Sequence, residues 1–371
     1  MRAVRALGAL GALGAREGVG PARLGTMTTP TPRARLSLPP IPRVGVRIAG
    51  TGSSLPSRIL SNAELATVVQ TSDEWIYQRT GIRQRTLCDW SKGESNTTLC
   101  TEALRRALEA AGMEARELDL IICGTITQSQ RCPSTACLVG AALNAGHCGA
   151  WDLGAACSGF VFGMNAAHDL IRAGTHRAIG VIGCDTVSSL IDYNNRGVCI
   201  LFGDAAGAAV VRATDDTSKG ILAQATRADG SGWRDLFMPE CFGDIRPEDD
   251  LHQVRPDCLF MNGREVYRFA VTTFSEIIDE TLKKAGVSAE QVDMFVCHQS
   301  NARILEAARE RFGIPNDKLY VNIDKVGNSS AGSVPLCLDE LTRAGRVREG
   351  QLVLMVAFGA GLTWGSSLWQ M

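Results

Sequence analysis

The chain has 371 residues, of which 45% are hydrophobic and 21% are charged, as in an ordinary globular protein with a large core. Its 38 basic and 39 acidic residues leave a formal net charge of -1, which provides no field to attract nucleic acid or an anionic membrane. No apolar run reaches the roughly 18 residues that a membrane-spanning helix needs. We therefore expect a soluble protein with neither nucleic-acid nor membrane partners.

Residues 1–43 differ from the rest of the chain, because they contain seven arginines, a single acid and no core pattern. Such a composition is typical of a disordered segment. It also fits a transit peptide, which would direct the protein to a plastid or a mitochondrion. Met27 offers the other reading, in which translation starts there and the protein is cytoplasmic.

The thirteen cysteines follow no metal-site or redox-motif spacing. Neither C-x-x-C nor H-E-x-x-H occurs, and an odd number of thiols in a chain of this size argues against a disulfide framework. We expect most of them to be small buried side chains in a reducing compartment, and we predict no metal site.

Two segments of the chain resemble each other when they are aligned from residues 103 and 277, which are 174 positions apart. In each segment a helical pattern ends at a glycine, Gly112 or Gly286, and an apolar run typical of a buried strand follows. A helix followed by a buried strand, occurring twice, predicts an α/β fold made of duplicated halves.

We place these halves at residues 44–215 and 216–371, and we expect ligands to bind near the seam between them. The stretch 212–258 is rich in Asp, Gly, Pro and Arg. This composition predicts surface loops that carry no chemistry.

Cys157 lies in a turn of small residues between a predicted strand and a predicted helix. A thiol at the start of a helix faces unpaired N–H groups and the positive end of the helix dipole, which lowers its pKa and favours the thiolate. The alternative is a core cysteine without chemistry, which is our expectation for Cys123, Cys184 and Cys297.

Two further polar residues occupy comparable places in the second half. His298 directly follows an apolar strand and opens the polar run HQSN, and Asn328 lies in the small-residue turn 326–333 ahead of a helix. Either could be structural, since a glycine-flanked Asn is often only a turn residue. The glycine-rich run 358–365 could direct backbone N–H groups at an oxyanion.

Taken together, ACSGF at Cys157, HQSN at His298, GNSSAGS at Asn328 and FGAGLTWGS near the C-terminus closely resemble 3-oxoacyl-[acyl-carrier-protein] synthase III. The resemblance runs from about residue 45 to the C-terminus. It implies a thiolase fold with duplicated halves in αβαβα layers, and a homodimer. It also implies the initiating condensation of type II fatty acid synthesis, with acyl-CoA and acyl carrier protein (ACP) as substrate and partner and no cofactor.

The resemblance also implies a role for each residue of the site. A short acyl-CoA, most simply acetyl-CoA, would acylate Cys157, and malonyl-ACP would then lose CO2 and attack the acyl group. His298 and Asn328 would donate hydrogen bonds to the malonyl thioester oxygen, while the backbone N–H groups of Cys157 and Ala360 would hold the oxyanion.

The family further suggests where CoA and ACP bind. Trp75 would stack on the adenine, Arg79 would lie near the phosphates, and Arg196 would clamp the other face of the base. The alternative for the first two is an amphipathic helix with an exposed Arg. The full set of implied CoA and ACP contacts is Thr71, Trp75, Arg79, Arg196, Gly197, Arg264, Tyr267, Asn301 and Arg303.

This sequence departs from the family pattern at four positions. Arg264 stands where Asn is frequent, Tyr267 replaces Phe, and Ser300 replaces Ala. Cys132 takes the place of a bulkier residue that closes the acyl pocket across the dimer, which predicts longer or branched primers. The same Cys/His/Asn set would also suit a condensing enzyme or acyltransferase of secondary metabolism.

Overall fold

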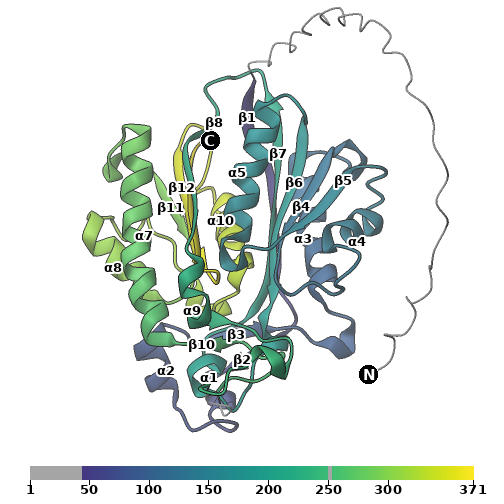
Figure 1. Cartoon of the computed structure of the whole chain (residues 1–371). Helices are drawn as coiled ribbons and strands as arrows, with labels where there is room; N and C mark the ends of the chain where they lie inside the picture. The colour runs from purple at the N-terminus through teal and green to yellow at the C-terminus, as the bar shows by residue number, and fades with distance from the viewer. Residues whose placement is uncertain (1–43, 250–252) are drawn as a thin grey trace, which may run out of the picture. The chain divides into compact units, whose positions relative to one another are not determined.

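The computed structural model describes residues 44–249 and 253–371, so the predictions for residues 1–43 lie outside the described residues. Two central sheets organise this part of the chain (Figure 1). The first has the strand order β1-β7-β6-β4-β5 and the second the order β11-β12-β13-β8. Their strands are β1 (Gly45–Ser54), β4 (Leu120–Gly124), β5 (Gly149–Leu153), β6 (Ala178–Thr186), β7 (Asp204–Thr214), β8 (Gly220–Ala228), β11 (Met294–Cys297), β12 (Leu352–Gly359) and β13 (Thr363–Gln370).

Each central sheet is parallel at one end and antiparallel at the other. Strand β4 runs parallel to β5 and β6, and β11 runs parallel to β12, whereas β7 and β13 are antiparallel to their neighbours. Strands β4, β6 and β11 are buried along their whole length, as parallel strands covered on both faces must be. Two short pairs lie outside the sheets: β2 (Arg58–Ser61) with β3 (Gln84–Leu87), and β9 (Leu236–Phe237) with β10 (Phe260–Met261).

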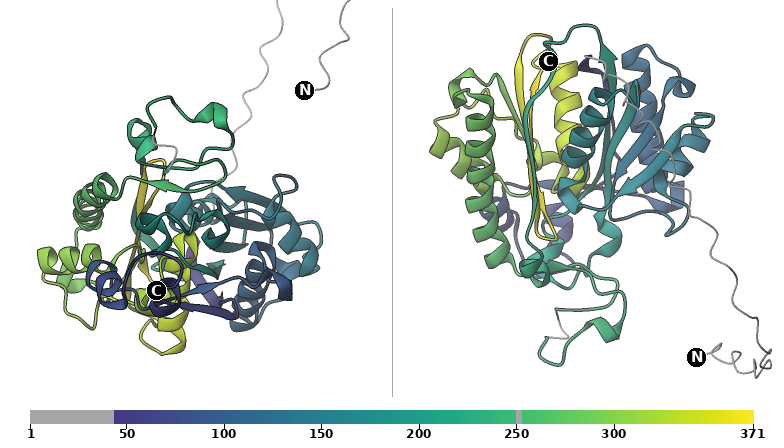
Figure 2. Two further views of the ribbon diagram at one scale, coloured as in Figure 1. Left: turned by 90° about the horizontal axis from the view of Figure 1, so that it is seen from below. Right: turned by 45° about the horizontal axis from the view of Figure 1, so that its top comes forward.

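The helices alternate with the sheets in layers (Figures 1 and 2). Helices α5 and α10 lie between the sheets and share one apolar core with strands of both. Helices α3 and α4 pack on the outer face of the first sheet, and α7 and α8 pack on the outer face of the second, which gives the αβαβα order of the thiolase fold. The helices are α1 (Asn62–Leu65), α2 (Asp73–Thr80), α3 (Asn96–Ala111), α4 (Thr135–Ala142), α5 (Gly159–Arg172), α6 (Arg196–Cys199), α7 (Gly263–Ala285), α8 (Ala302–Phe312), α9 (Ile323–Val326) and α10 (Ser333–Arg343).

The duplication extends well beyond the two segments that reveal it in the sequence. Helices α3 and α7 end at Gly112 and Gly286, both left-handed, with φ of 64° and 69°. The same offset of 174 residues relates the first residues of β4 and β11, and those of α5 and α10. It also relates two short 3-10 turns, η3 (Ala156–Ser158) and η8 (Ser330–Gly332), which precede the two central helices.

The stretch 212–258 corrects one prediction. It contains strand β8, which pairs with β13 along its length and completes the second sheet, so it is not only surface loop. Its alternation of buried and exposed residues is hidden in the sequence by small residues such as Ala223 and Ala225. The predicted boundary between the halves, at 215, falls between β7 and β8.

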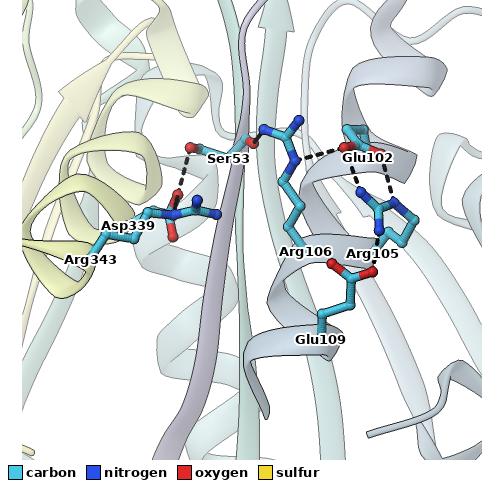
Figure 3. A network of polar contacts seen from close by, with 7 residues as sticks. All are labelled: Ser53, Glu102, Arg105, Arg106, Glu109, Asp339 and Arg343. Carbon is cyan, nitrogen blue, oxygen red and sulfur yellow. Dashed lines mark hydrogen bonds and ion pairs between the residues drawn. The ribbon is translucent and has the colours of Figure 1, made fainter. Parts of the chain in front are cut away.

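A buried carboxylate joins the halves (Figure 3). Asp339 on α10 accepts hydrogen bonds from Thr51 Oγ1 (2.9 Å) and Ser53 Oγ (2.6 Å), which belong to β1 of the first half. Its neighbour Arg343 donates Nε to the same carboxylate at 2.9 Å, and Arg106 Nη1 on α3 donates to the Ser53 carbonyl at 2.7 Å. The network thus links α10, β1 and α3.

In the described ranges, no helix combines the length and apolar character that would let it cross a bilayer.

Candidate active site

Three turns bring the predicted nucleophile, imidazole and amide to one cavity. Cys157 is in η3, between β5 and α5; His298 directly follows β11; and Asn328 lies two residues before η8. All three side chains line the same cavity, whose empty volume is about 630 Å³. The remaining wall is mostly apolar and comprises Leu201, Phe202, Leu236, Met261, Gly263, Val266, Tyr267, Phe269, Ser300, Asn301, Ile304, Phe358, Gly359 and Leu362.

The Cys157 thiol is buried, with 7% of the residue exposed. Burial raises its pKa to about 12, and the hydrogen bond from Ser330 Oγ, at 3.2 Å from Sγ, acts in the opposite direction. The negative charge of Asp185 raises the pKa further. The predicted lowering of this pKa is therefore wrong, because desolvation of the thiolate outweighs the favourable position at a helix start.

His298 is held as a neutral imidazole. Burial lowers its pKa to about 3, and Nδ1 lies 2.7 Å from Ser333 Oγ. The ring packs edge-on against Phe358, with 5.3 Å between ring centroids. When Ser333 donates to Nδ1, the ring proton lies on Nε2, where it can be donated to a ligand.

Asn328 is fixed at both its backbone and its side chain. Its N–H donates to the Leu201 carbonyl at 2.9 Å, and its own carbonyl accepts from Gly203 N at 3.0 Å. The side-chain Oδ1 accepts from Ser330 N at 2.9 Å, inside the turn. The amide NH2 group is therefore the part of this side chain that can meet a ligand.

Glycine keeps the approach to the Cys157 amide open. A Cβ atom at Gly359 would lie 2.7 Å from Cys157 N. In the duplicated half the equivalent position is Asp185, whose Oδ2 accepts from Ala331 N at 3.2 Å, and Ala331 is the counterpart of Cys157. The Asp185 carboxylate thus occupies the N–H group of Ala331, whereas Gly359 leaves the N–H group of Cys157 open. An oxyanion site made by the N–H groups of Cys157 and Ala360 would require this opening.

The residues predicted to bind adenine come together around Trp75 on α2. The guanidinium carbons of Arg79 and Arg196 each lie 4.6 Å from the centroid of its ring. Arg196 also donates Nη1 to the Gln70 carbonyl at 3.1 Å. The buried Oγ1 of Thr71 finds no hydrogen-bond partner within the described residues.

Asn301 connects this region to the cavity, whose wall it shares with Tyr267. Its Oδ1 caps α8 by accepting from Arg303 N at 2.9 Å, and its Nδ2 donates to the Arg79 carbonyl at 3.1 Å. Arg303 is exposed and does not line the cavity.

The other predicted contacts lie outside the cavity. Arg264, in the first turn of α7, and Gly197, in α6, are exposed. Cys132 is an exposed residue of the segment between β4 and α4, so its predicted role in an acyl pocket depends on a second copy of the chain. By contrast, Cys123, Cys184 and Cys297 are fully buried, as expected of core cysteines.

Sequence reasoning missed Ser330, Ser333, Asp185 and Gly359. Three serines crowd the turn 329–333, and nothing in the sequence distinguishes the one that contacts sulfur. The duplication offers one signal, because aligning the halves places Ser330 opposite Ala156, immediately before the nucleophile's counterpart.

This fold and this cavity define a thiolase-fold condensing enzyme of the acyltransferase class. Residues 151–230 match the family described as 3-oxoacyl-[acyl-carrier-protein (ACP)] synthase III, and residues 282–371 match its C-terminal part. The beta-ketoacyl-[acyl-carrier-protein] synthase III of Caldanaerobacter subterraneus is 44% identical over 326 residues, which cover 88% of this chain and 98% of that protein. The chain belongs to this family.

Solved structures agree with this assignment. The 3-oxoacyl-[acyl-carrier-protein] synthase III of Aquifex aeolicus is 41% identical with a TM-score of 0.82, over 88% of this chain and all of that one. A priming beta-ketosynthase of a polyketide biosynthetic pathway is 35% identical with a TM-score of 0.82, over 90% of this chain and 98% of that one.

Proposed function

We propose that the protein transfers an acyl group from a short acyl-CoA to Cys157 and condenses it with malonyl-ACP, which yields a 3-oxoacyl-ACP, CoA and CO2. This reaction starts type II fatty acid synthesis. The observation that carries the proposal is the convergence of Cys157, His298 and Asn328 in one apolar cavity.

In the first stage the sulfur of Cys157 attacks the thioester carbonyl, and CoA leaves with the thiol proton. The tetrahedral oxyanion lies between the backbone N–H groups of Cys157 and Ala360. Trp75 and Arg196 hold the adenine, and Arg79 lies near the phosphates.

In the second stage the malonyl thioester takes the place of CoA beside the acylated cysteine. As CO2 leaves, charge develops on the thioester oxygen, and His298 Nε2–H and the Asn328 amide donate to it. A neutral imidazole suits this task, since it carries a proton to donate and adds no charge that would hold the substrate carboxylate in place. Every group used belongs to the chain or to its substrates, so we propose that no cofactor takes part.

Acyl loading followed by mass spectrometry tests the first stage. After incubation with acetyl-, isobutyryl- or octanoyl-CoA, intact mass should show one acyl group, and Cys157→Ala should show none. A clear acetyl preference would discard the prediction, based on Cys132, of longer or branched primers.

Release of CO2 from malonyl-ACP tests the second stage. We expect His298→Ala and Asn328→Ala to be acylated normally but to release CO2 about two to four orders of magnitude more slowly, the usual cost of losing such donors. Native-rate condensation by Asn328→Ala would contradict its assigned role.

A related condensing enzyme of secondary metabolism is the second candidate, favoured by the likeness to the priming beta-ketosynthase. Both candidates load Cys157, so loading alone does not separate them. A loaded enzyme that releases no CO2 from malonyl-ACP, but passes its acyl group to another acceptor, would support the second candidate.

We also propose a cytoplasmic homodimer. All thirteen cysteines, which fall within the described residues, are free thiols, which suits a reducing compartment. Strand β5 lies at the edge of the first sheet with Trp151 42% exposed, a surface suited to covering by a second copy. Light scattering on the purified chain tests the dimer.

A further inference from the structure

Ser330 directs its hydroxyl at the nucleophile from the opposite half of the molecule. Its Oγ lies 3.2 Å from Cys157 Sγ, and only 1% of the residue is exposed. Two hydrogen bonds fix the turn on either side of this hydroxyl: Ser330 N donates to Asn328 Oδ1, and Ala331 N donates to Asp185 Oδ2. Ser330 has a φ of 50°, a left-handed conformation that Ser adopts only where its surroundings impose it.

Asp185 is the competing acceptor for this hydroxyl: burial raises the pKa of the Asp185 carboxyl, and a hydrogen bond from Ser330 acts in the opposite direction. A serine hydroxyl has one proton and cannot donate to both groups at once. Asp185 Oδ1 already accepts from Ile126 N at 2.8 Å and from the hydroxyls of Thr125 and Thr127, each at 3.1 Å. Because the carboxylate keeps these donors, the Ser330 hydroxyl can turn to the sulfur when charge develops there.

The surroundings of Cys157 supply little else that favours a thiolate. The cavity wall, as described, contains no Lys or Arg, and His298 is neutral. Asp185 is the charged group that acts on the thiol, and its charge opposes ionisation. The start of α5 contributes a favourable dipole, but among the residues that the structure describes, Ser330 is the side chain that donates directly to the sulfur.

We infer that Ser330 is a further catalytic residue, whose hydroxyl donates a hydrogen bond to the Cys157 thiolate and stabilises it for attack on the acyl thioester. This role rests on the proposed function, in which Cys157 carries the acyl group. Ser330 keeps its proton throughout: the sulfur gains the acyl group, and the thiol proton leaves with CoA. The turn η8, which is the duplicate of the nucleophile turn η3, thus supplies a hydrogen-bond donor to the nucleophile.

Alkylation of Cys157 by iodoacetamide across a pH series tests this inference, with the modified peptide measured by mass spectrometry. Only the thiolate reacts, so the profile reports the pKa of this thiol. In Ser330→Ala and Ser330→Gly, we expect the profile to shift to higher pH and the rate at a fixed pH below the thiol pKa to fall at least about tenfold, the effect of losing one hydrogen bond to a charged group. Ser329→Ala is the matched control, because the hydroxyl of Ser329, the residue next to Ser330, is buried without a partner among the described residues.

Native profiles in both Ser330 variants would overturn the inference. Glycine adopts the left-handed backbone conformation without strain. If Ser330→Ala is destabilised, the alkylation profile of Ser330→Gly therefore still tests the inference. Alkylation needs neither acyl-CoA nor ACP. If the native thiol is alkylated normally but no acyl-CoA loads it, the proposed function fails while the result for Ser330 stands.

Discussion

His298 shows how burial alone assigns a role to a side chain. An ordinary histidine would gain charge near pH 6.5, but this one stays neutral until about pH 3. We therefore expect CO2 release by the acyl-loaded enzyme to show no loss centred near pH 6.5 as the pH falls from 8 to about 5. A loss there that disappears in His298→Gln would show that the imidazole ionises in the normal range.

The same depressed pKa predicts how stability depends on pH. Between about 3 and 6.5 the unfolded chain binds a proton at His298 that the folded chain does not, so stability from this residue is full above 6.5 and is lost as the pH falls through that window. Urea unfolding at several pH values gives the slope of the unfolding free energy against pH. In His298→Gln this slope should be smaller than in the native protein by the equivalent of up to one bound proton. Equal slopes in both proteins would contradict the assignment.

Ser300 is a second residue with an unusual environment. The residue lines the cavity, and its Oγ is buried without a hydrogen-bond partner among the described residues. Since an unpaired buried hydroxyl costs about 1 to 3 kcal/mol, Ser300→Ala should stabilise the free protein by about 1 kcal/mol. If the hydroxyl binds a polar group of the thioester substrate, the variant should also have a several-fold higher KM with unchanged kcat.

Ser329→Ala again provides the comparison for Ser300→Ala. Its hydroxyl is equally without a partner in the described part of the chain, but it does not line the cavity. Ser329→Ala should therefore be stabilised by a similar amount, and its KM should be that of the native protein. A native KM in both variants would show that Ser300 binds no substrate group.

At the scale of elements, the end of β12 decides whether the Cys157 amide can be used. A Cβ at Gly359 would come within 2.7 Å of that nitrogen, against backbone that cannot easily move. We expect Gly359→Ala to lower Cys157 acylation about a hundredfold or more, as losing an oxyanion donor does. Gly230→Ala is the control, because a Cβ there would meet nothing within 4 Å. Acylation at the native rate in Gly359→Ala would remove Cys157 N from the proposed oxyanion site.

The sequence predicted the elements of the site better than their chemical environment. The three turns that carry Cys157, His298 and Asn328, the strands at 120–124 and 294–297, and the helix after Cys157 follow from local pattern and lie where expected. The raised pKa of the Cys157 thiol does not follow from local pattern, because burial and the charge of Asp185 raise it, and both depend on elements that come together only in the fold. The predicted low pKa was wrong for this reason.

At the scale of the whole molecule, the duplication was readable because the two copies keep one register of 174 residues from α3 and α7 to α5 and α10. What the sequence could not give is how the copies are joined. The residues that join them, on β1 and α10, are ordinary Thr, Ser and Asp without a recognisable motif. These residues form their hydrogen bonds only when α5 and α10 pack together in one core.

Asp339 therefore gives the test that belongs to the whole molecule. The residue is 1% exposed, and its carboxylate accepts from Thr51 of the other half. It also accepts from Ser53 of that half and from Arg343 (Figure 3). Asparagine has the same shape but presents an NH2 group to one of these donors, so Asp339→Asn should lower the free energy of unfolding by about 1 to 3 kcal/mol. Urea unfolding at neutral pH measures this loss.

The exposed Asp215 provides the matched substitution for that measurement, and Asp215→Asn should unfold like the native protein. The Asp339 network lies on β1, α3 and α10, and none of its residues lines the active-site cavity. Acylation of Cys157 by Asp339→Asn should therefore remain native at temperatures where the variant is folded. If the two variants unfolded at the same urea concentration, the contact between β1 and α10 would contribute no net stability, and the shared apolar core alone would hold the halves together.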